Sequence, residues 1–280
     1  MLRIVTDSTS DLTAALAAES GVELIPLHVI IGGKTYAEGV DLSKEQFYER
    51  LAVSKELPST SQPSPAVMQK YFQRYLDAGD DVIYIGVSSR FSGTLQAARI
   101  GRDLVSEPER VTIYDSMSVS YGQGLLALHA AKLAREGKTP AEITAALDDL
   151  RPRIHIVFSV GGLDNLRKSG RINNLSFLFG SLLNIKPIMM IDRDSVVQVY
   201  EKARGKKNAY RSLFRYLEEF PPDPAFAFGL GHTHDPEQAA TYRQDLQALG
   251  ITDLLLFEIG AVIGTHVGIG TIGFLYVSKK

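Results

Sequence analysis

Two turns rich in serine and threonine carry the side chains best suited to bind an anion. Residues 58–65 read Pro-Ser-Thr-Ser-Gln-Pro-Ser-Pro, and residues 88–96 read Ser-Ser-Arg-Phe-Ser-Gly-Thr-Leu-Gln. Each turn leads into a helical pattern, so each offers backbone N–H groups together with hydroxyl donors. This combination suits a carboxylate or a phosphate, which also gains from the helix dipole. Ordinary helix capping explains the same residues equally well.

Three aspartates stand where predicted strands meet turns. Asp7 and Asp11 flank a strand-to-helix turn, and Asp115 ends another strand. Carboxylates that converge in this way are able to hold Mg²⁺ or to act as acid and base. Asp residues at such turns more often cap helices, so both interpretations stay open.

A histidine pair, His232 and His234, follows a predicted strand in the second half. Two histidines at i and i+2 of an extended segment point the same way and are able to share a metal. In the alternative interpretation Asp235 caps the helix that starts at Pro236, and the histidines lie exposed on the loop.

A cationic segment in the second half precedes a long apolar one. Arg167 and Lys168 end a predicted helix, where the dipole favours cations, whereas Arg171 lies beyond the helix stop and can reach a ligand or a partner's phosphate. Residues 175–183 and 188–191 are apolar nearly all round. They either pack in the core or line a cavity for an elongated apolar ligand.

His266 lies in the middle of an apolar and glycine-rich segment. A polar ring in such surroundings must find a hydrogen-bond partner or face a cavity. His266 is therefore either a satisfied core residue or a donor that faces a bound carboxylate.

Several other signatures are absent or stand in the wrong context. Residues 268–273 have the letters of a dinucleotide fingerprint, but they precede a strand instead of a helix. The chain has no Walker A motif and no Gly-x-Ser-x-Gly elbow. It contains no Cys, which excludes a disulfide scaffold, a thiol enzyme and a thiolate metal site.

Composition bounds the remaining classes. The chain has 280 residues, enough for one large domain or two ordinary ones. Its 30 Lys and Arg against 32 Asp and Glu lack the basic excess of a general nucleic-acid binder, so we expect no nucleic-acid partner. Residues 254–277 contain Glu258, His266 and five glycines, which predicts short strands with glycine turns there and no membrane-spanning helix. Without cysteines or a secretory signal, we expect a cytoplasmic protein.

The first half alternates apolar strands with amphipathic helices. The predicted strands are 2–6, 23–31, 81–87 and 111–114, and the predicted helices are 11–20, 43–53, 64–78, 139–150 and one after each of Ser92 and Ser120. This alternation predicts a largely parallel sheet with helices on both faces. Ligands bind at the carboxyl ends of such strands, where we expect the polar clusters at Asp7, Ser88 and Asp115 to meet.

The second half begins near residue 152 and reads as a mixed α+β layer. Its predicted strands are 154–160, 187–191, 196–200, 225–230, 254–259 and 273–277, and its predicted helices are 163–168, 175–184, 206–220 and 236–249. The sequence therefore predicts an α/β domain over residues 1–152 and an α+β domain over residues 153–280.

Taken together, these segments resemble the DegV family. The matching motifs occur in the family's order and span nearly the whole chain: Val5-Thr6-Asp7-Ser8, Thr60-Ser61-Gln62-Pro63, Phe91-Ser92-Gly93-Thr94, Asp115-Ser116, Leu166-Arg167-Lys168-Ser169-Gly170-Arg171-Ile172, Lys186-Pro187-Ile188 and residues 259–270. Each motif is short, but the ordered set is specific. One position departs, because Ile269 stands where the family often has proline, which affects loop stiffness more than chemistry.

The resemblance implies a two-domain fold with a long-chain fatty acid buried between the domains, its acyl chain covered by the second. It also implies that the protein is the acyl-carrier subunit of a bacterial fatty-acid kinase, without a cofactor or metal of its own and with transient membrane contact. Such a subunit presents the bound carboxylate to a separate ATP-using kinase and leaves with an acyl-phosphate. Carried over by position, Thr60, Ser61 and Ser92 would hold the carboxylate, with the Gly93 N–H and His266 nearby.

The same resemblance assigns Arg171 and Arg204 to phosphoryl transfer or partner docking. Two alternatives remain beside this interpretation. One is a stand-alone Asp-based phosphatase or hydrolase that uses Asp7, Asp11 and Asp115. The other is a lipid-sensing module that has no kinase partner.

Overall fold

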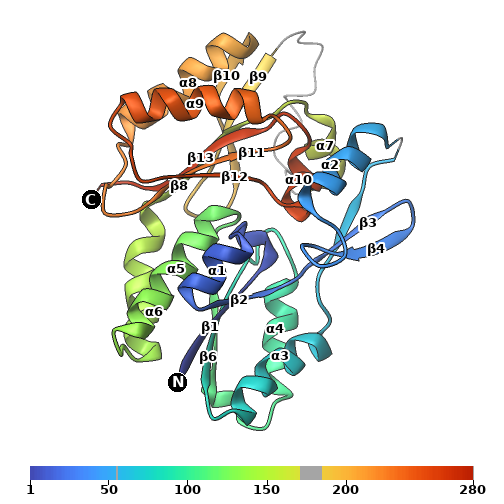
Figure 1. Cartoon of the computed structure of the whole chain (residues 1–280), viewed down its shortest axis with the longest axis vertical. Helices are drawn as coiled ribbons and strands as arrows, with labels where there is room; N and C mark the ends of the chain where they lie inside the picture. The colour runs from blue at the N-terminus through green and yellow to red at the C-terminus, as the bar shows by residue number, and fades with distance from the viewer. Residues whose placement is uncertain (55, 171–184, 280) are drawn as a thin grey trace. The chain divides into compact units, whose positions relative to one another are not determined.

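The computed structural model describes residues 1–54, 56–170 and 185–279 (Figure 1). The chain separates into two compact units, which we describe one at a time. Unit 1 comprises Met1–Leu42 and Thr60–Pro152, and unit 2 comprises Ser43–Ser59 and Arg153–Lys280. Residues 43–59 lie within the predicted first domain, whereas in the structure they pack with unit 2.

Unit 1 is built on a parallel sheet with the strand order β2-β1-β6-β7. Its strands are β1 (Leu2–Asp7), β2 (Val22–Ile25), β6 (Asp81–Gly86) and β7 (Val111–Asp115). Its helices are α1 (Ala14–Ser20), α3 (Pro65–Asp77), α4 (Thr94–Asp103), α5 (Tyr121–Arg135) and α6 (Pro140–Leu150), with 3-10 turns η1 (Ser8–Ser10) and η2 (Pro108–Arg110), while η3 (Arg151–Arg153) lies at the end of the unit. The predicted parallel α/β arrangement of the first half is confirmed.

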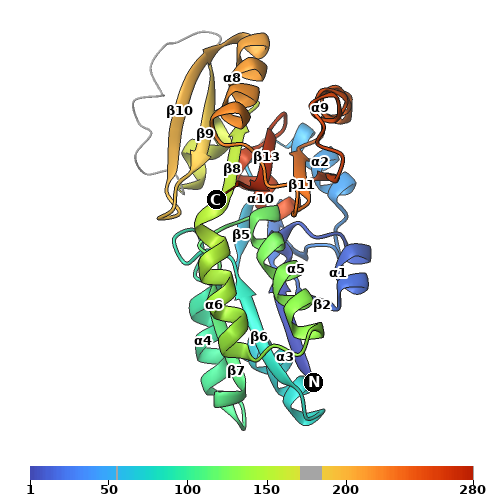
Figure 2. The same ribbon diagram turned by 90° about the vertical axis from the view of Figure 1, so that its left-hand side faces the viewer.

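Helices cover both faces of this sheet because its strands are buried on both sides. On one face Val82 and Tyr84 of β6 pack with Met68 and Phe72 of α3 and with Leu95 of α4. Successive residues of a strand point to opposite faces, so Ile83 and Ile85 turn to the other side, where α5 lies. Figure 2 shows α5 and α6 side by side within the unit.

A small sheet with the order β4-β3-β5 joins β3 (His28–Ile31), β4 (Lys34–Ala37) and β5 (Ser59–Ser61). β3 and β4 form a hairpin that turns at Gly32 and Gly33, and both glycines have positive φ angles, of 57° and 74°. The expected single strand over 23–31 is wrong, because it divides into β2 and β3 at Pro26. Proline has no N–H to continue a sheet ladder, which accounts for the break.

Unit 2 is built on a sheet with the order β10-β9-β8-β13-β11-β12. Its strands are β8 (Ile154–Ser159), β9 (Ile185–Ile191), β10 (Val197–Arg204), β11 (Phe228–His232), β12 (Leu254–Glu258) and β13 (Ile272–Val277). Its helices are α2 (Lys44–Val53), α7 (Asp164–Ser169), α8 (Gly205–Glu219), α9 (Pro236–Ala248) and α10 (Ala261–Val267). Among the described strands of unit 2, only β11 and β12 pair in parallel, which agrees with the predicted α+β character.

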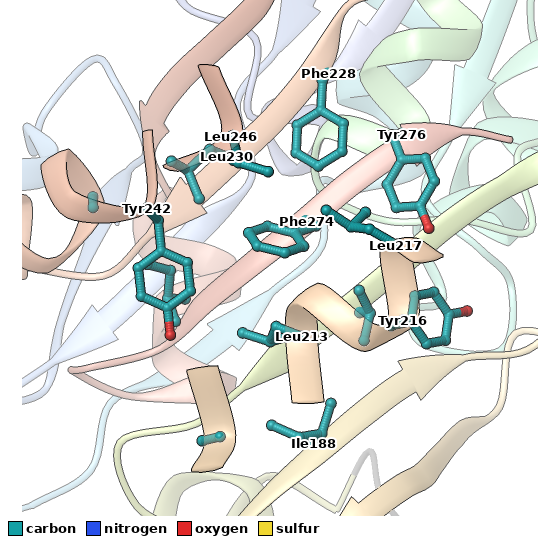
Figure 3. Close-up of a cluster of buried hydrophobic side chains, with 14 of the residues drawn as sticks. Ile188, Leu213, Tyr216, Leu217, Phe228, Leu230, Tyr242, Leu246, Phe274 and Tyr276 are labelled. Carbon is teal, nitrogen blue, oxygen red and sulfur yellow. The ribbon is translucent and has the colours of Figure 1, made fainter. Parts of the chain in front are cut away.

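The core of unit 2 lies where α8 and α9 cover the sheet (Figure 3). Leu213 and Tyr216 of α8 and Tyr242 of α9 pack against Phe228 and Phe274 of the strands. Burial of each such side chain contributes about 1.5–3 kcal/mol relative to leaving it exposed. This core fixes the strands and helix starts that carry the polar groups discussed below.

The expectation of short strands with glycine turns throughout residues 254–277 is wrong in one part, because α10 lies between β12 and β13. Gly264 allows this helix to approach α2 closely, since a Cβ there would lie 2.5 Å from the Tyr48 hydroxyl. The Thr265 hydroxyl donates to the Ala261 carbonyl at 2.8 Å and supports the helical turn. The helix expected over residues 175–184 lies outside the described residues.

Among the described residues, no helix combines the length and the apolar character that a membrane span needs.

Candidate ligand site at the Ser/Thr turns of unit 1

The two Ser/Thr turns of the sequence meet within unit 1, because the helices they open pack against each other. Gly101 of α4 fits closely over Pro65 and Met68 of α3, where a Cβ on Gly101 would lie 2.6 Å from Cβ of Met68. At the starts of the same helices, the side-chain amide of Gln62 lies against Gly93. The structure therefore joins the turn that holds Thr60 and Ser61 to the turn that holds Ser92 and Gly93.

The turn between β6 and α4 is ordered by its own serine. The Ser88 carbonyl accepts hydrogen bonds from the N–H groups of Phe91 and Ser92, at 3.0 and 3.2 Å. The Ser92 hydroxyl accepts from the Thr94 N–H at 3.2 Å and lies 2.8 Å from the Thr94 hydroxyl. These bonds hold the Ser92 side chain, which is half-buried, at the first turn of α4.

A side chain closes the N-terminus of α4 at one amide, that of Thr94, which donates to the Ser92 hydroxyl. Gly93 is the N-cap and offers no side-chain acceptor. Among the described residues, the N–H groups of Gly93, Leu95 and Gln96 have no acceptor. Free amides at a helix start form a site for an anion, because they donate hydrogen bonds and the dipole adds positive potential.

Thr60 and Ser61 lie half-buried in β5, just before α3. The Ser61 hydroxyl has no hydrogen-bond partner within the part of the chain that the structure describes. Ser64 does the capping of α3, because its hydroxyl accepts from the Val67 N–H at 3.3 Å. The helix-capping interpretation of the first turn thus applies to Ser64. The Ser61 hydroxyl is able to donate a hydrogen bond to a ligand instead.

The Asp7 carboxylate accepts hydrogen bonds from several segments of unit 1. This buried carboxylate accepts from the Tyr84 hydroxyl at 2.7 Å, from the Val87 N–H at 3.2 Å, and from the N–H and hydroxyl of Thr9. Burial first, and the Asp7 charge next, raise the pKa of Tyr84 well above its ordinary value, so Tyr84 stays a donor. Asp7 therefore fixes the ends of β1 and β6, on which the turn before α4 depends.

The other two aspartates also hold loops. Asp11 accepts from the Ser120 hydroxyl, and Asp115 accepts from the Met117 N–H at 3.0 Å and the Ser89 N–H at 3.3 Å. The expected meeting of the three polar clusters at one edge is confirmed by these bonds and by those of Asp7. Over residues 1–54, 56–170 and 185–279, no group of three or more His, Asp or Glu side chains is arranged for a metal ion.

The histidine pair of unit 2 does not have the geometry expected of it. His232 is buried at the end of β11, where burial lowers its pKa. His234 has a positive φ of 54° and stacks on Tyr48 at 5.7 Å, so the segment is not extended at His234. Asp235 caps α9 through the Gln238 N–H at 3.1 Å, as the alternative interpretation predicts. That interpretation also expects both histidines to be exposed, which is confirmed for His234 and wrong for His232.

Two other predicted site residues lie in unit 2. His266 is half-buried in the last turn of α10, and Arg204 is exposed at the end of β10, where it is the N-cap of α8. Arg171 lies outside the described residues. Gln62 is the site residue that sequence reasoning missed, although it stands within the Thr60-Ser61-Gln62-Pro63 motif.

A hollow of about 720 Å³ also lies in unit 2, at the C-terminal ends of α8 and α9. Tyr210, Phe214 and Phe228 line it, and Glu218 and Asp253 are on its wall. Its acidic residues repel a carboxylate, and none of the predicted site residues lines it. The donor-rich turns of unit 1 are the better candidate for an anionic headgroup.

Comparison with known proteins identifies the family. The model of the DegV family matches residues 1–279. A DegV domain-containing protein of Deinococcus radiodurans is 38% identical over 275 residues, which cover 97% of this chain and 96% of the relative.

Solved structures show the same fold. A fatty-acid-binding DegV family protein from Thermus thermophilus superposes with a TM-score of 0.88 at 31% identity, covering 99% of each chain. A stearic-acid-binding protein from Eubacterium ventriosum superposes with a TM-score of 0.90 at 25% identity, covering 100% of this chain and 99% of that one.

Proposed function

This chain belongs to the DegV family, and we propose that it binds a long-chain fatty acid whose carboxylate is held at the two Ser/Thr turns of unit 1. The donors we assign are the hydroxyls of Thr60, Ser61 and Ser92 and the N–H of Gly93. The observation that carries the assignment is the open N-terminus of α4, with free amides next to the Ser92 hydroxyl and joined to β5 through Gln62.

The chemistry of a fatty acid fits this arrangement. Each buried CH₂ contributes about 0.8 kcal/mol, so a long tail supplies most of the affinity. A carboxylate leaves water only where donors replace its hydration. Several hydroxyls and amides at a helix start supply such donors.

The names of the structural neighbours support the ligand class. The proteins from Thermus thermophilus and Eubacterium ventriosum are described as binding a fatty acid and stearic acid, respectively. Both match this chain over almost its whole length, and both are at least 25% identical to it.

The finer part of the proposal concerns what happens to the bound acid. We infer that the carboxylate is presented to a separate, ATP-using fatty-acid kinase. There a carboxylate oxygen bonds to the γ-phosphorus of ATP, the bond between that phosphorus and the β,γ-bridging oxygen breaks, and ADP leaves. Such transfer depends on positioning and on neutralising charge, which suits Arg171 and Arg204, while His266 supplies a further donor. These three assignments rest on the family resemblance.

The kinase part is tested with the protein loaded with palmitate and mixed with ATP and a purified fatty-acid kinase. Acyl-phosphate is trapped as the hydroxamate. We expect Arg171→Ala to retain palmitate, as measured by native mass spectrometry, while hydroxamate forms at least about tenfold more slowly. Arg167→Ala is the matched control, because Arg167 lies exposed on α7. Equal rates for Arg171→Ala and the unmodified protein would remove Arg171 from the reaction.

A bound fatty acid with no acyl-phosphate in the unmodified protein contradicts the kinase part and leaves a lipid-binding protein. That outcome favours the lipid-sensing alternative. The cytoplasmic location and the transient membrane contact stay predictions.

A further inference from the structure

A small polar cavity in unit 2 is lined by groups that donate hydrogen bonds. It has about 20 Å³, room for one water-sized group, at the meeting point of β8, β9, α8 and α9. Its polar side chains are those of Ser159, Lys186, Lys206, Gln238 and Tyr242. Each of them carries a donor, and no lining residue is acidic. A cavity of this size admits one oxygen of a ligand, with the rest of the ligand outside.

The donors on the wall are available. Ser159 and Tyr242 are 7% and 3% exposed, and neither hydroxyl has a hydrogen-bond partner among the described residues. The Gln238 side-chain amide is likewise without a partner in the described part of the chain. Lys186 donates to the Gly161 carbonyl at 2.5 Å, which leaves its two other N–H bonds. A ligand that only accepts hydrogen bonds would satisfy these donors together.

Two of the cavity's lining residues are cations, Lys186 and Lys206, and Arg204 and Lys207 are the sequence neighbours of Lys206 on α8 and at its N-cap. Lys186, Arg204, Lys206 and Lys207 form no ion pair with any described residue, whereas Arg215, later on α8, pairs with Glu201 at 3.1 Å. Residues 171–184 contain no Asp or Glu, so they supply no carboxylate either. Burial, and then the charge of Lys206, lower the pKa of Lys186. An anion near these two lysines would relieve their repulsion.

Lys206 and Lys207 lie at the end of α8 where the helix dipole disfavours cations. Cations are unfavourable at a helix N-terminus, where the dipole is positive, yet Lys206 and Lys207 stand in the first turn of α8. That turn has no acidic residue and no side-chain cap. A bound anion would be stabilised there both by the lysine side chains and by the positive end of the helix dipole.

We propose that Lys186 and Lys206, with the Ser159 hydroxyl, form a subsite for one oxygen of a phosphate-type oxyanion. Two sources share this chemistry: free inorganic phosphate and the phosphoryl group that the proposed kinase reaction transfers. Assignment to the transferred group rests on the proposed function. Binding of the oxyanion itself does not, because it depends on unit 2 alone.

The direct test measures thermal unfolding of the full chain in sodium phosphate against sodium chloride at equal ionic strength. We expect a saturable rise in Tm with phosphate. Lys206→Ala should raise the apparent Kd for phosphate by at least about tenfold. Lys207→Ala is the matched control, since it removes a charge from the same helical turn but not from the cavity wall. The same phosphate dependence in all three proteins would overturn the subsite.

The Tm of Lys206→Ala in chloride shows whether the variant is folded. We expect it not to fall, because the substitution removes a cation from a helix N-terminus. Ser159→Ala is the second variant, and it should weaken phosphate binding with no change in net charge. An unchanged phosphate Kd in Ser159→Ala would remove that hydroxyl from the subsite.

The two sources are separated in the palmitate and kinase assay. If the subsite takes the transferred phosphoryl group, Lys206→Ala keeps bound palmitate but forms acyl hydroxamate at least about fivefold more slowly than Lys207→Ala. Loss of phosphate binding with unchanged hydroxamate formation would overturn that assignment and leave a site for free phosphate. If the unmodified protein forms no acyl-phosphate, the kinase part of the proposed function fails, and the phosphate titration still decides the subsite.

Discussion

The side-chain amide of Gln62 lies directly against Gly93, so closely that a Cβ on Gly93 would come within 3.0 Å of its Oε1. Gln62 follows the turn with Thr60 and Ser61, and Gly93 opens α4. This contact places two groups of donors, far apart in the sequence, at one point of unit 1. The predictions below follow from that arrangement and from the groups that support it.

Gly93→Ala should weaken fatty-acid retention without unfolding the protein. Gly93 has a φ of −77°, which alanine adopts freely, so the substitution acts through the displaced Gln62 amide and not through backbone strain. We expect roughly a fivefold to tenfold loss in a lipid-exchange assay, about 1–1.4 kcal/mol. Adding Gln62→Ala removes the clash and should restore part of the retention. A double variant no better than Gly93→Ala alone would show that the contact is not the cause.

Ser92→Ala should weaken retention through the loss of a donor to the carboxylate. A hydrogen bond to a charged group contributes roughly 1.5–3 kcal/mol, or at least about tenfold in affinity. Ser89→Ala is the matched control, because Ser89 is exposed in the same turn. Measured by exchange of labelled palmitate, equal retention in the two variants would take Ser92 out of the site.

Asp7→Asn should act on stability. The carboxylate accepts from Tyr84, Val87 and Thr9, and an amide turns one of its acceptors into a donor that faces another donor. We expect a decrease of about 2–4 kcal/mol in the free energy of unfolding, measured with urea, compared with about 1 kcal/mol for Tyr84→Phe. An unchanged free energy of unfolding in Asp7→Asn would contradict this structural role, and Asp7 would again be a candidate catalytic acid.

The unfolding free energy should fall as pH is lowered through the range where His155 titrates. Burial first, then Arg193, lower the pKa of His155 to about 4, and its Nδ1 lies 2.9 Å from the Tyr216 hydroxyl. Because the folded pKa is below the unfolded value, the contribution is present above about pH 6.5 and is lost as pH falls toward 4. We expect a loss of about 2 kcal/mol between pH 6.5 and 5 from this group. His155→Phe should flatten the dependence in that window, and an unaltered slope would contradict the assignment.

Local chemistry made much of the fold predictable. Ser43 and Gln46 form a capping box at the start of α2, and Thr139 and Glu142 form another at the start of α6. Such signals depend on residues a few positions apart, so a sequence displays them directly. The predicted strands and helices of both halves likewise depend on the periodicity of apolar residues and on the glycines and prolines that end each element.

What the sequence did not show depends on contacts between distant segments. Residues 43–59 join unit 2 because Tyr48 donates to the Ile259 carbonyl at 2.8 Å and Lys44 to the Glu258 carbonyl at 2.6 Å. The close approach of α10 to α2 at Gly264 and the turn at His234 have the same origin. Hydrophobic period carries no information about which remote segment will supply a partner.

The candidate site was predictable in its residue types but not in its division of labour. Ser64 and Ser61 look alike in the sequence, yet Ser64 caps α3 and Ser61 does not. Likewise the position of Asp7 after a strand is typical of a catalytic acid. In the structure, however, its carboxylate accepts hydrogen bonds from Tyr84 and Val87 of the same unit. Only the geometry of neighbouring donors separates these roles.

The measurement that tests the central claim most directly is native mass spectrometry of the purified protein, followed by organic extraction and lipid analysis. The account predicts a one-to-one adduct with the mass of a long-chain fatty acid, which is lost or strongly reduced in Ser92→Ala but retained in Ser89→Ala. A protein that carries no adduct and takes up no added palmitate would contradict fatty-acid binding at the Ser/Thr turns.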